Sequence, residues 1–183
     1  MSELTVAARY AKSLIDLAQE QNQVEEVRND MGLFLHTLKV NTQLKAVLAN
    51  PIVPYLKKLK ILEEIFSAKV TKLSLAFFKI MINKGRGEVL YSTAQEFINL
   101  YDIKKHIVRA YVVSATELSE ANKQTMIAEI KQATGGTIIL DAKTDPSLIG
   151  GFVLKVGDKQ VDTSISSNLN KLKKEFAQRV ISN

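Results

Sequence analysis

The sequence contains no cysteine and only two histidines among its 183 residues. Disulfides, thiolate zinc sites and cysteine nucleophiles are therefore excluded, and a reducing compartment is permitted. His36 and His106 lie far apart in the chain, and neither belongs to a metal-binding pattern such as H-x-x-x-H. We expect both to be structural or surface residues, and we predict no metal site and no cofactor.

Long apolar runs are also missing, since no run approaches the roughly 18 residues that a membrane-spanning helix requires. The opening residues, MSELTVAARY, lack the basic start and apolar middle of a signal peptide. Hydrophobic residues nevertheless make up 46% of the chain, and its length suits one domain or two small ones. We expect a soluble, cytoplasmic, globular protein.

The common catalytic signatures do not occur. The sequence has no G-x-S-x-G nucleophile elbow, no G-x-x-x-x-G-K-[ST] phosphate loop and no G-x-G-x-x-G fingerprint. Adjacent acids such as Glu25-Glu26 and Glu63-Glu64 point in different directions on a helix and are typical of solvated faces. We therefore predict no catalytic residues and a protein that is not an enzyme.

The net charge of +6 has no clustered origin, because the lysines are scattered and often lie beside acids. The most basic stretch, KLKKEFAQR at residues 171–179, contains a single aromatic residue, which we place on the inward face of a helix. We expect a solvated basic surface and no nucleic-acid partner. A helical RNA-binding protein remains the alternative.

The first part of the chain has the apolar spacing of one helix after another. Six helices are predicted, at residues 3–20, 24–38, 42–48, 54–66, 71–83 and 87–101. Asn50-Pro51 ends the third helix, and Lys84-Gly85 ends the fifth. Short loops between these helices predict a six-helix bundle over residues 1–105.

After Lys105 the pattern changes to β-branched and aromatic residues in short alternating runs. Strands are predicted at residues 107–115, 137–143, 152–156 and 159–161, and Ser119 starts a helix that ends at Gly135-Gly136. A last helix places four apolar side chains inward: Ile165, Leu169, Leu172 and Phe176. The chain is therefore expected to be mostly α, with a small α+β domain at residues 106–183.

Three of the eight glycines fall in the stretch DPSLIGGFVLKVGDKQVDTS, residues 145–164. Its acids are not spaced as metal ligands, and its glycines do not form a phosphate cradle. Turns are predicted at Asp145-Pro146 and Gly157-Asp158, and Asp162 or Ser164 is expected to cap the last helix. Gly150-Gly151 indicates a bulge or a close backbone approach before the strand.

Two of the predicted helices, residues 3–20 and 71–83, have a wider apolar face than a bundle helix needs. One interpretation is that both lie at the centre of the bundle. The other is a groove that accepts an amphipathic partner helix, with Tyr10, Leu14 and Leu17 on one wall and Leu75, Phe78 and Ile82 on the other.

Three stretches of the chain resemble a known family: TVAARYAKSLIDLA, ANPIVPYLKKLKILEEIF with FFKIMINKGRGEVL, and DPSLIGGFVLKVGDKQVDTSISSNLNKLKKEF. The last is the most specific, because Gly150-Gly151, Gly157-Asp158, Asp162, Ser164, Leu169 and Leu172 have the family's spacing. The chain is similar over nearly its full length to the delta subunits of F-type ATP synthases, which correspond to the mitochondrial oligomycin-sensitivity-conferring protein. Thr163 and Phe176 depart from the usual pattern.

The resemblance implies a six-helix amino-terminal domain, a smaller carboxy-terminal domain and a non-catalytic stator role in proton-driven ATP synthesis. It further implies that a groove between the first and fifth helices holds the amino-terminal helix of an alpha subunit, while the second domain meets the carboxy terminus of the b-subunit stalk. The expected groove residues are Val6, Tyr10, Leu14, Leu17, Leu75, Phe78, Ile80 and Ile82; the rotation of the fifth helix, and so the choice between Ile80 and Ile82, is left open by the sequence. The protein would then lie at the cytoplasmic face of a bacterial membrane, associated only through the complex.

Overall fold

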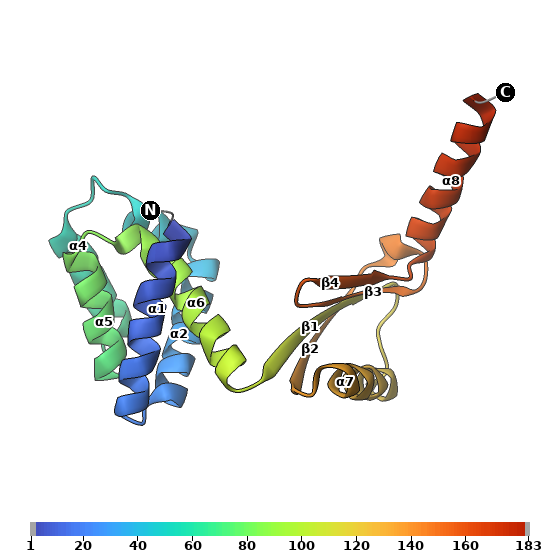
Figure 1. Ribbon diagram of the computed structural model, residues 1–183. Helices are drawn as coiled ribbons and strands as arrows, with labels where there is room; N and C mark the ends of the chain where they lie inside the picture. Colours follow the sequence, from blue (N-terminus) through green and yellow to red (C-terminus); the bar gives the residue numbers. More distant parts are fainter. Residues whose placement is uncertain (1–2, 182–183) are drawn as a thin grey trace. The chain divides into compact units, whose positions relative to one another are not determined.

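The computed structural model describes residues 3–181, and it describes side chains as far as Lys173. The chain divides after Lys104 into two compact units. The first is helical, and the second contains a small four-stranded sheet (Figure 1). The prediction of a mostly helical chain with a small α+β part at its carboxy-terminal end is therefore confirmed.

The helices of the first unit begin and end where local signals place them. They are α1 (Glu3–Glu20), α2 (Val24–Val40), α3 (Thr42–Ala49), α4 (Tyr55–Phe66), α5 (Lys72–Asn83) and α6 (Leu90–Lys104), with a 3-10 turn η1 (Gly87–Val89) before the last. Asn41 caps α3 by accepting a hydrogen bond from the Leu44 amide, and Thr71 caps α5 in the same way. Gly85, at φ +69°, ends the turn after α5 in the left-handed region that favours glycine.

The core of this unit is built around aromatic side chains from three helices. Phe34, Phe66 and Phe78 are fully buried, and the rings of Phe34 and Phe78 lie 4.6 Å apart between centroids. Alanines of α1 such as Ala11 and Ala18 are also fully buried, which allows α1 to pack closely against α6. Burial of these large rings stabilises the unit.

Two buried charged side chains, Asp30 and Lys58, form hydrogen bonds between helices. The Asp30 carboxylate of α2 accepts hydrogen bonds from the Thr71 amide at 2.8 Å and from the Thr71 hydroxyl at 2.7 Å. The Lys58 ammonium of α4 donates to the Leu48 carbonyl at 2.8 Å, at the carboxy-terminal end of α3. Asp30 thus accepts from a backbone amide at the amino-terminal end of α5, and Lys58 donates to a backbone carbonyl at the carboxy-terminal end of α3. Backbone groups at helix ends have no partner within their own helix.

The second unit has the order β1 (Ile107–Ser114), α7 (Glu120–Thr134), β2 (Thr137–Thr144), η2 (Pro146–Leu148), β3 (Phe152–Val156), β4 (Lys159–Asp162) and α8 (Ile165–Ile181). Its sheet has the strand order β2-β1-β3-β4, with β1 and β2 parallel and the other pairs antiparallel. Ser119 caps α7, and Gly135 ends it at φ +71°. Because α7 lies between β1 and β2 in the chain, it forms the crossover that connects these two parallel strands.

The glycine-rich stretch consists of turns and caps. Gly151 lies so close to the Thr163 carbonyl that a side chain at this position would clash with backbone atoms, and it has a φ of +76°. Gly157 occupies the β3–β4 turn at φ +57°. The Asp162 carboxylate accepts hydrogen bonds from the Ser164 amide and hydroxyl, and the Ser164 hydroxyl accepts one from the Ser167 amide. The Gly150-Gly151 pair thus marks a close backbone approach.

The expectation that the apolar stripe of α8 faces inward is wrong for three of its four residues. Ile165, Leu169 and Leu172 expose 46%, 52% and 47% of their surface. Phe176 lies outside the residues whose side chains are described. The spacing is amphipathic in sequence, but the main packing partner of α8 is the short turn η2. These three apolar side chains therefore remain largely uncovered.

Candidate protein-binding sites

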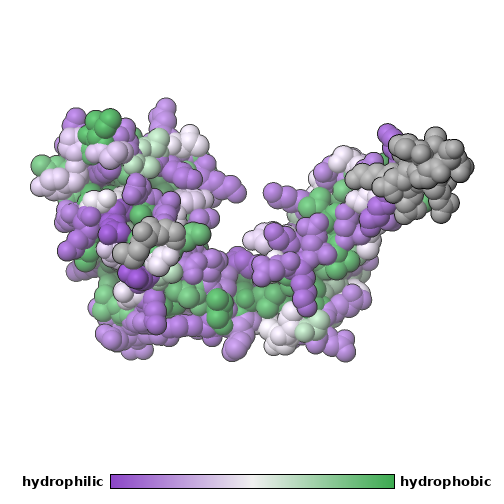
Figure 2. All heavy atoms as spheres, turned by 45° about the horizontal axis from the view of Figure 1, so that its top comes forward, coloured by the Kyte–Doolittle hydropathy of each residue, from purple (hydrophilic) through white to green (hydrophobic). Residues whose placement is uncertain are grey.

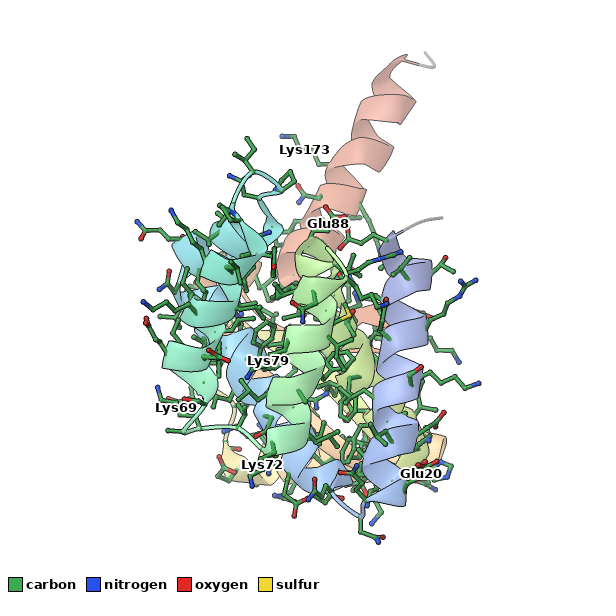
Figure 3. The ribbon with its side chains drawn as sticks, turned by 90° about the vertical axis from the view of Figure 1, so that its left-hand side faces the viewer. Glu20, Lys69, Lys72, Lys79, Glu88 and Lys173 are labelled. Atoms are coloured by element: carbon green, nitrogen blue, oxygen red, sulfur yellow. The ribbon has the colours of Figure 1, made fainter. Side chains whose placement is uncertain are left out.

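The first candidate site lies between α1 and α5, which run side by side in the helical unit (Figure 3). Their closest aromatic contact joins Tyr10 to Phe77, whose rings meet edge to face with centroids 6.5 Å apart. Phe77 is nearly covered, whereas Tyr10 is only half-buried. An aromatic side chain of this kind can contribute a large contact area to a partner.

The α1 wall of this site is formed by residues at helical spacing. Val6, Tyr10 and Leu17 lie on one side of α1, and Leu17 exposes 40% of its surface. Leu14, which we expected on the same wall, is 2% exposed and belongs to the core. Four residues exceed a full helical turn by about 40°. Leu14 is therefore rotated further around α1 than Tyr10, toward the bundle axis.

The α5 wall differs from the sequence-based expectation. Phe78 is fully buried and Ile82 is 2% exposed, so both are core residues. Leu75 shares the side of α5 that bears Lys79, and Lys79 forms an ion pair with Glu63 of α4 at 2.6 Å. The expectation that these three residues line the groove is therefore wrong. The near-continuous apolar surface of α5 had left its rotation undetermined.

Ile80 is the one expected α5 residue that faces outward on the α1 side, with 52% of its surface exposed. Sequence analysis missed Leu73 and Phe77, which precede Ile80 by seven and three positions and therefore share its helix face. That spacing is the signal that could have identified them. We call the surface formed by Val6, Tyr10, Leu17, Leu73, Phe77 and Ile80 the α1–α5 groove.

One end of the α1–α5 groove is hollow and cationic. A depression of about 190 Å³ is lined by Val6, Arg9, Tyr10, Ser13 and Arg86. Arg9 and Arg86 bring two guanidinium groups to its rim, beside the apolar side chains. This end therefore suits a partner that combines apolar side chains with a carboxylate or with the carbonyl end of a helix.

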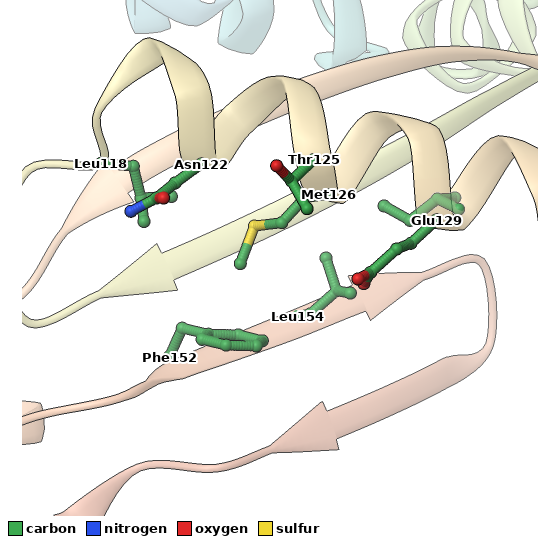
Figure 4. A pocket seen from close by; sticks show the side chains of 8 residues that line it. Leu118, Asn122, Thr125, Met126, Glu129, Phe152 and Leu154 are labelled. Atoms are coloured by element: carbon green, nitrogen blue, oxygen red, sulfur yellow. The ribbon is translucent and has the colours of Figure 1, made fainter.

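The second candidate site is an apolar cleft between α7 and the sheet (Figure 4). Two adjoining hollows of about 420 and 510 Å³ share Ile130 and Leu154 in their walls. We call them together the α7–β3 cleft; its other apolar lining residues are Val108, Leu118, Met126, Ala133, Phe152, Val156 and Val161. Sequence analysis did not predict this site.

The cleft follows from strand register. Ala110 and Val112 of β1 are buried, and they pair with Val156 and Leu154 of β3, which share their face of the sheet. Helix α7 packs mainly against β2, so the half of this face formed by β3 and β4 is less covered. Val161 of β4 accordingly exposes 54% of its surface. The alternating side chains of FVLKV, residues 152–156, were the sequence signal that could have indicated this cleft.

Neither histidine is buried, and His106 has a positive φ of 52°. His36 is exposed, and the His106 carbonyl accepts a hydrogen bond from the Thr137 amide. Within residues 3–181, no group of three or more potential metal-ligating side chains occurs. In the same part of the chain, no helix combines the length and hydrophobicity needed to cross a membrane.

An apolar groove beside a half-buried aromatic residue, and an apolar cleft between a helix and a sheet, are typical of a protein that binds other proteins. The profile described as "ATP synthase delta (OSCP) subunit" matches residues 6–176. The chain belongs to this family, as the resemblance predicted. The family's members are non-catalytic structural subunits of the proton-transporting ATP synthase and belong to its peripheral stalk.

Individual relatives agree with this assignment. The chain is 38% identical over 181 residues to the ATP synthase subunit delta of Cytophaga hutchinsonii, and the match covers 99% of each chain. It is 32% identical over 173 residues to the chloroplastic subunit delta of Ochrosphaera neapolitana, covering 94% of this chain and 97% of the relative. A chain of the Toxoplasma gondii mitochondrial ATP synthase hexamer shares the fold, with a TM-score of 0.69 at 22% identity, covering 93% and 97%.

Proposed function

We propose that this chain links the catalytic head of an F-type ATP synthase to its b-subunit stalk and so prevents the head from turning with the rotor. In this role the α1–α5 groove binds the amino-terminal helix of an alpha subunit. The second unit binds the carboxy terminus of the b-subunit. The chain then lies at the cytoplasmic face of a bacterial membrane and is associated with it only through the complex.

The half-buried Tyr10 against Phe77 is the observation that carries this proposal. Tyr10 and Ile80 stand on opposite sides of the α1–α5 groove, and both keep surface that the bundle does not use. A partner helix with apolar residues at spacings of three and four could cover both walls at once. Membership in the delta subunit family supports the choice of an ATP synthase subunit as that partner.

The α7–β3 cleft supports the second contact. Its apolar walls are bordered by polar side chains, among them Asn122, Glu129 and Asp158. Such a cleft can bind one apolar face of a stalk helix while its rim remains solvated. The exposed stripe of α8, from Ile165 to Leu172, offers a further apolar surface in the same unit.

A link under load must dissociate slowly. A nanomolar complex corresponds to about 12 kcal/mol of binding free energy. Burying several leucine and aromatic side chains at roughly 1.5 to 3 kcal/mol each supplies much of this, although association entropy and side-chain ordering oppose it. Two separate contacts on one chain would further slow release, because the second re-forms while the first holds.

Titration calorimetry of the full chain with a peptide that copies the alpha amino terminus tests the first contact. We expect heat release and saturable binding, because the helix buries the exposed surface of Tyr10 and Ile80. A peptide of the same composition in scrambled order, which has no continuous apolar face, serves as the control. Absence of binding by the ordered peptide, or equal binding by both peptides, would contradict the assignment of the groove.

A further inference from the structure

A segment of the helical unit is free of carboxylates. Acidic residues make up 19 of the 183 positions, about one in ten, yet none occurs between Asp30 and Glu63. The same segment contains five lysines, at positions 39, 45, 57, 58 and 60. Local charge is therefore strongly one-sided in a chain whose cations are otherwise interspersed with acids.

The most exposed large apolar side chain of the unit, Ile52, lies in this segment, and two exposed neighbours follow it. Ile52 exposes 86% of its surface, Leu56 63% and Tyr55 56%. They belong to the loop between α3 and α4 and to the first turn of α4, at one end of the bundle (Figure 1). Figure 2 shows apolar atoms at this end of the unit, surrounded by hydrophilic ones. Exposed aliphatic side chains in such a group are typical of an interaction surface.

The loop that carries these side chains is restrained by local contacts. The Asn50 side chain accepts a hydrogen bond from the Ile52 amide at 2.9 Å, and Pro51 and Pro54 restrict the backbone. The buried Lys58 ammonium joins the end of α3 to α4 through the Leu48 carbonyl. The apolar side chains are therefore presented with little ordering cost on binding.

Lys57 and Lys60 complete the surface. Both are exposed, and neither forms an ion pair with another residue of the described part of the chain. Lys60 lies one turn after Leu56 on α4 and so shares its face. The nearest following acid, Glu63, forms its ion pair with Lys79 of α5. We call the surface formed by Ile52, Tyr55, Leu56, Lys57 and Lys60 the lysine–apolar tip.

The chemistry of the tip limits its partner. Unpaired ammonium groups beside exposed aliphatic side chains complement a surface that has carboxylates around apolar residues. Nucleic acid would use the lysines, but it needs aromatic stacking platforms, and Tyr55 is the single aromatic residue of the tip. An acidic protein surface therefore fits better than a nucleic acid.

The position of the tip indicates where that protein surface lies. Gly87 packs against the Leu48 carbonyl and lies beside the Lys58 ammonium, at the base of the tip. Arg86, the preceding residue, lines the cationic end of the α1–α5 groove. A protein seated at that end of the groove is thus adjacent to the tip.

We infer that the lysine–apolar tip is a second contact surface for the catalytic head and binds an acidic, partly apolar patch next to the helix held in the α1–α5 groove. This inference rests on the proposed function, because it takes the head as the partner of the helical unit. It adds an electrostatic contact to the apolar one. Such a contact increases the rate of association and weakens with added salt.

The test measures binding of the full chain to catalytic heads prepared without this subunit. The variant Lys57→Glu with Lys60→Glu reverses both exposed charges. We expect about tenfold weaker binding to the heads, with a smaller dependence on salt. The matched control, Lys69→Glu with Lys72→Glu, makes the same charge change at the other end of α4 and α5 (Figure 3) and should bind like the parent protein. Thermal unfolding verifies that both variants are folded.

Calorimetry with the alpha peptide separates this inference from the proposed function. If the parent protein fails to bind the peptide, the proposed groove is wrong. If the peptide binds and the tip variant binds heads as tightly as its control does, the tip is not a contact for the head. Sedimentation with phosphatidylglycerol vesicles provides a second comparison. Loss of vesicle binding in the tip variant, with unchanged head binding, would assign the tip to lipid and overturn the inference.

Discussion

Tyr10 and Phe78 are both aromatic residues of the apolar helices, but they occupy different environments. Tyr10 is half-buried on the surface of α1, whereas Phe78 is fully buried against Phe34 and Phe66. A substitution at Tyr10 should therefore affect binding, and one at Phe78 should affect folding. The two positions separate a proposed contact residue from a core residue within one helical unit.

We predict that Tyr10→Asp weakens binding of the alpha peptide about 30-fold or more and leaves the thermal unfolding temperature nearly unchanged, since a half-exposed carboxylate remains solvated. Phe78→Ala should instead lower the free energy of unfolding by about 3 to 5 kcal/mol, because it creates a cavity in the core. Calorimetry and chemical denaturation measure these two effects. Lys12→Asp, which places a carboxylate on another face of α1, serves as the control for Tyr10→Asp.

Unfolding of the Tyr10→Asp protein would indicate that Tyr10 is a core residue and would contradict its place in the groove. Full peptide binding by a folded Tyr10→Asp protein would show that the partner helix lies elsewhere.

Among the elements, α8 depends most clearly on one capping group. The Asp162 carboxylate accepts hydrogen bonds from the hydroxyls of Ser167 and Ser164 and from the Ser164 amide, and these bonds lower its pKa. Because the folded-state pKa lies below the ordinary one, the charged carboxylate stabilises the cap above the ordinary pKa. This contribution is lost as the pH falls through the lowered pKa.

We predict that Asp162→Ala reduces hydrogen-exchange protection of the Asn168 amide severalfold at neutral pH, because that amide donates to the Ser164 carbonyl in the first turn of α8. In acid below the lowered pKa the parent protein and the variant should converge, since the parent carboxylate is then protonated. Asp158→Ala, in the β3–β4 turn, is the control. Equal protection in parent and Asp162→Ala proteins at neutral pH would show that the cap does not hold α8.

At the scale of the whole molecule, a link fails when either of its contacts fails. The α1–α5 groove and the α7–β3 cleft lie in different units, so one can be altered without changing the core of the other. Val161 lines the cleft and exposes 54% of its surface, which makes it suitable for a charge substitution. Gln160, its neighbour, points to the opposite face of β4 and supplies a matched control.

We predict that the parent protein restores proton-driven ATP synthesis to membranes stripped of their catalytic heads and of this subunit, when heads are added back. Tyr10→Asp and Val161→Asp should each reduce the restored synthesis severalfold, because each weakens one contact, while Gln160→Asp should act like the parent. ATP hydrolysis by the heads should persist, because the chain performs no chemistry. Full restoration by Val161→Asp would exclude the α7–β3 cleft as the stalk contact.

Much of the fold was predictable because its signals are local. The cap at Ser119 and the stops at Gly85 and Gly135 are recognisable over a few residues, and the helices and strands begin and end close to the predicted positions. The candidate groove was predictable only in part. Tyr10, Leu17 and Ile80 keep exposed surface, whereas Leu14, Phe78 and Ile82 are core residues.

The sequence by itself determined which segments form helices and strands, where several of them begin or end, and the family to which the chain belongs, because each depends on residue type and short spacing. Only the tertiary structure decided the rotation of α5, the cover of the α7–β3 cleft and the exposure of the α8 stripe. These depend on which neighbour packs against each face. In α5 nearly every face is apolar, so the distinction between core and groove required the ion pair of Lys79 with Glu63 and the contact of Phe77 with Tyr10.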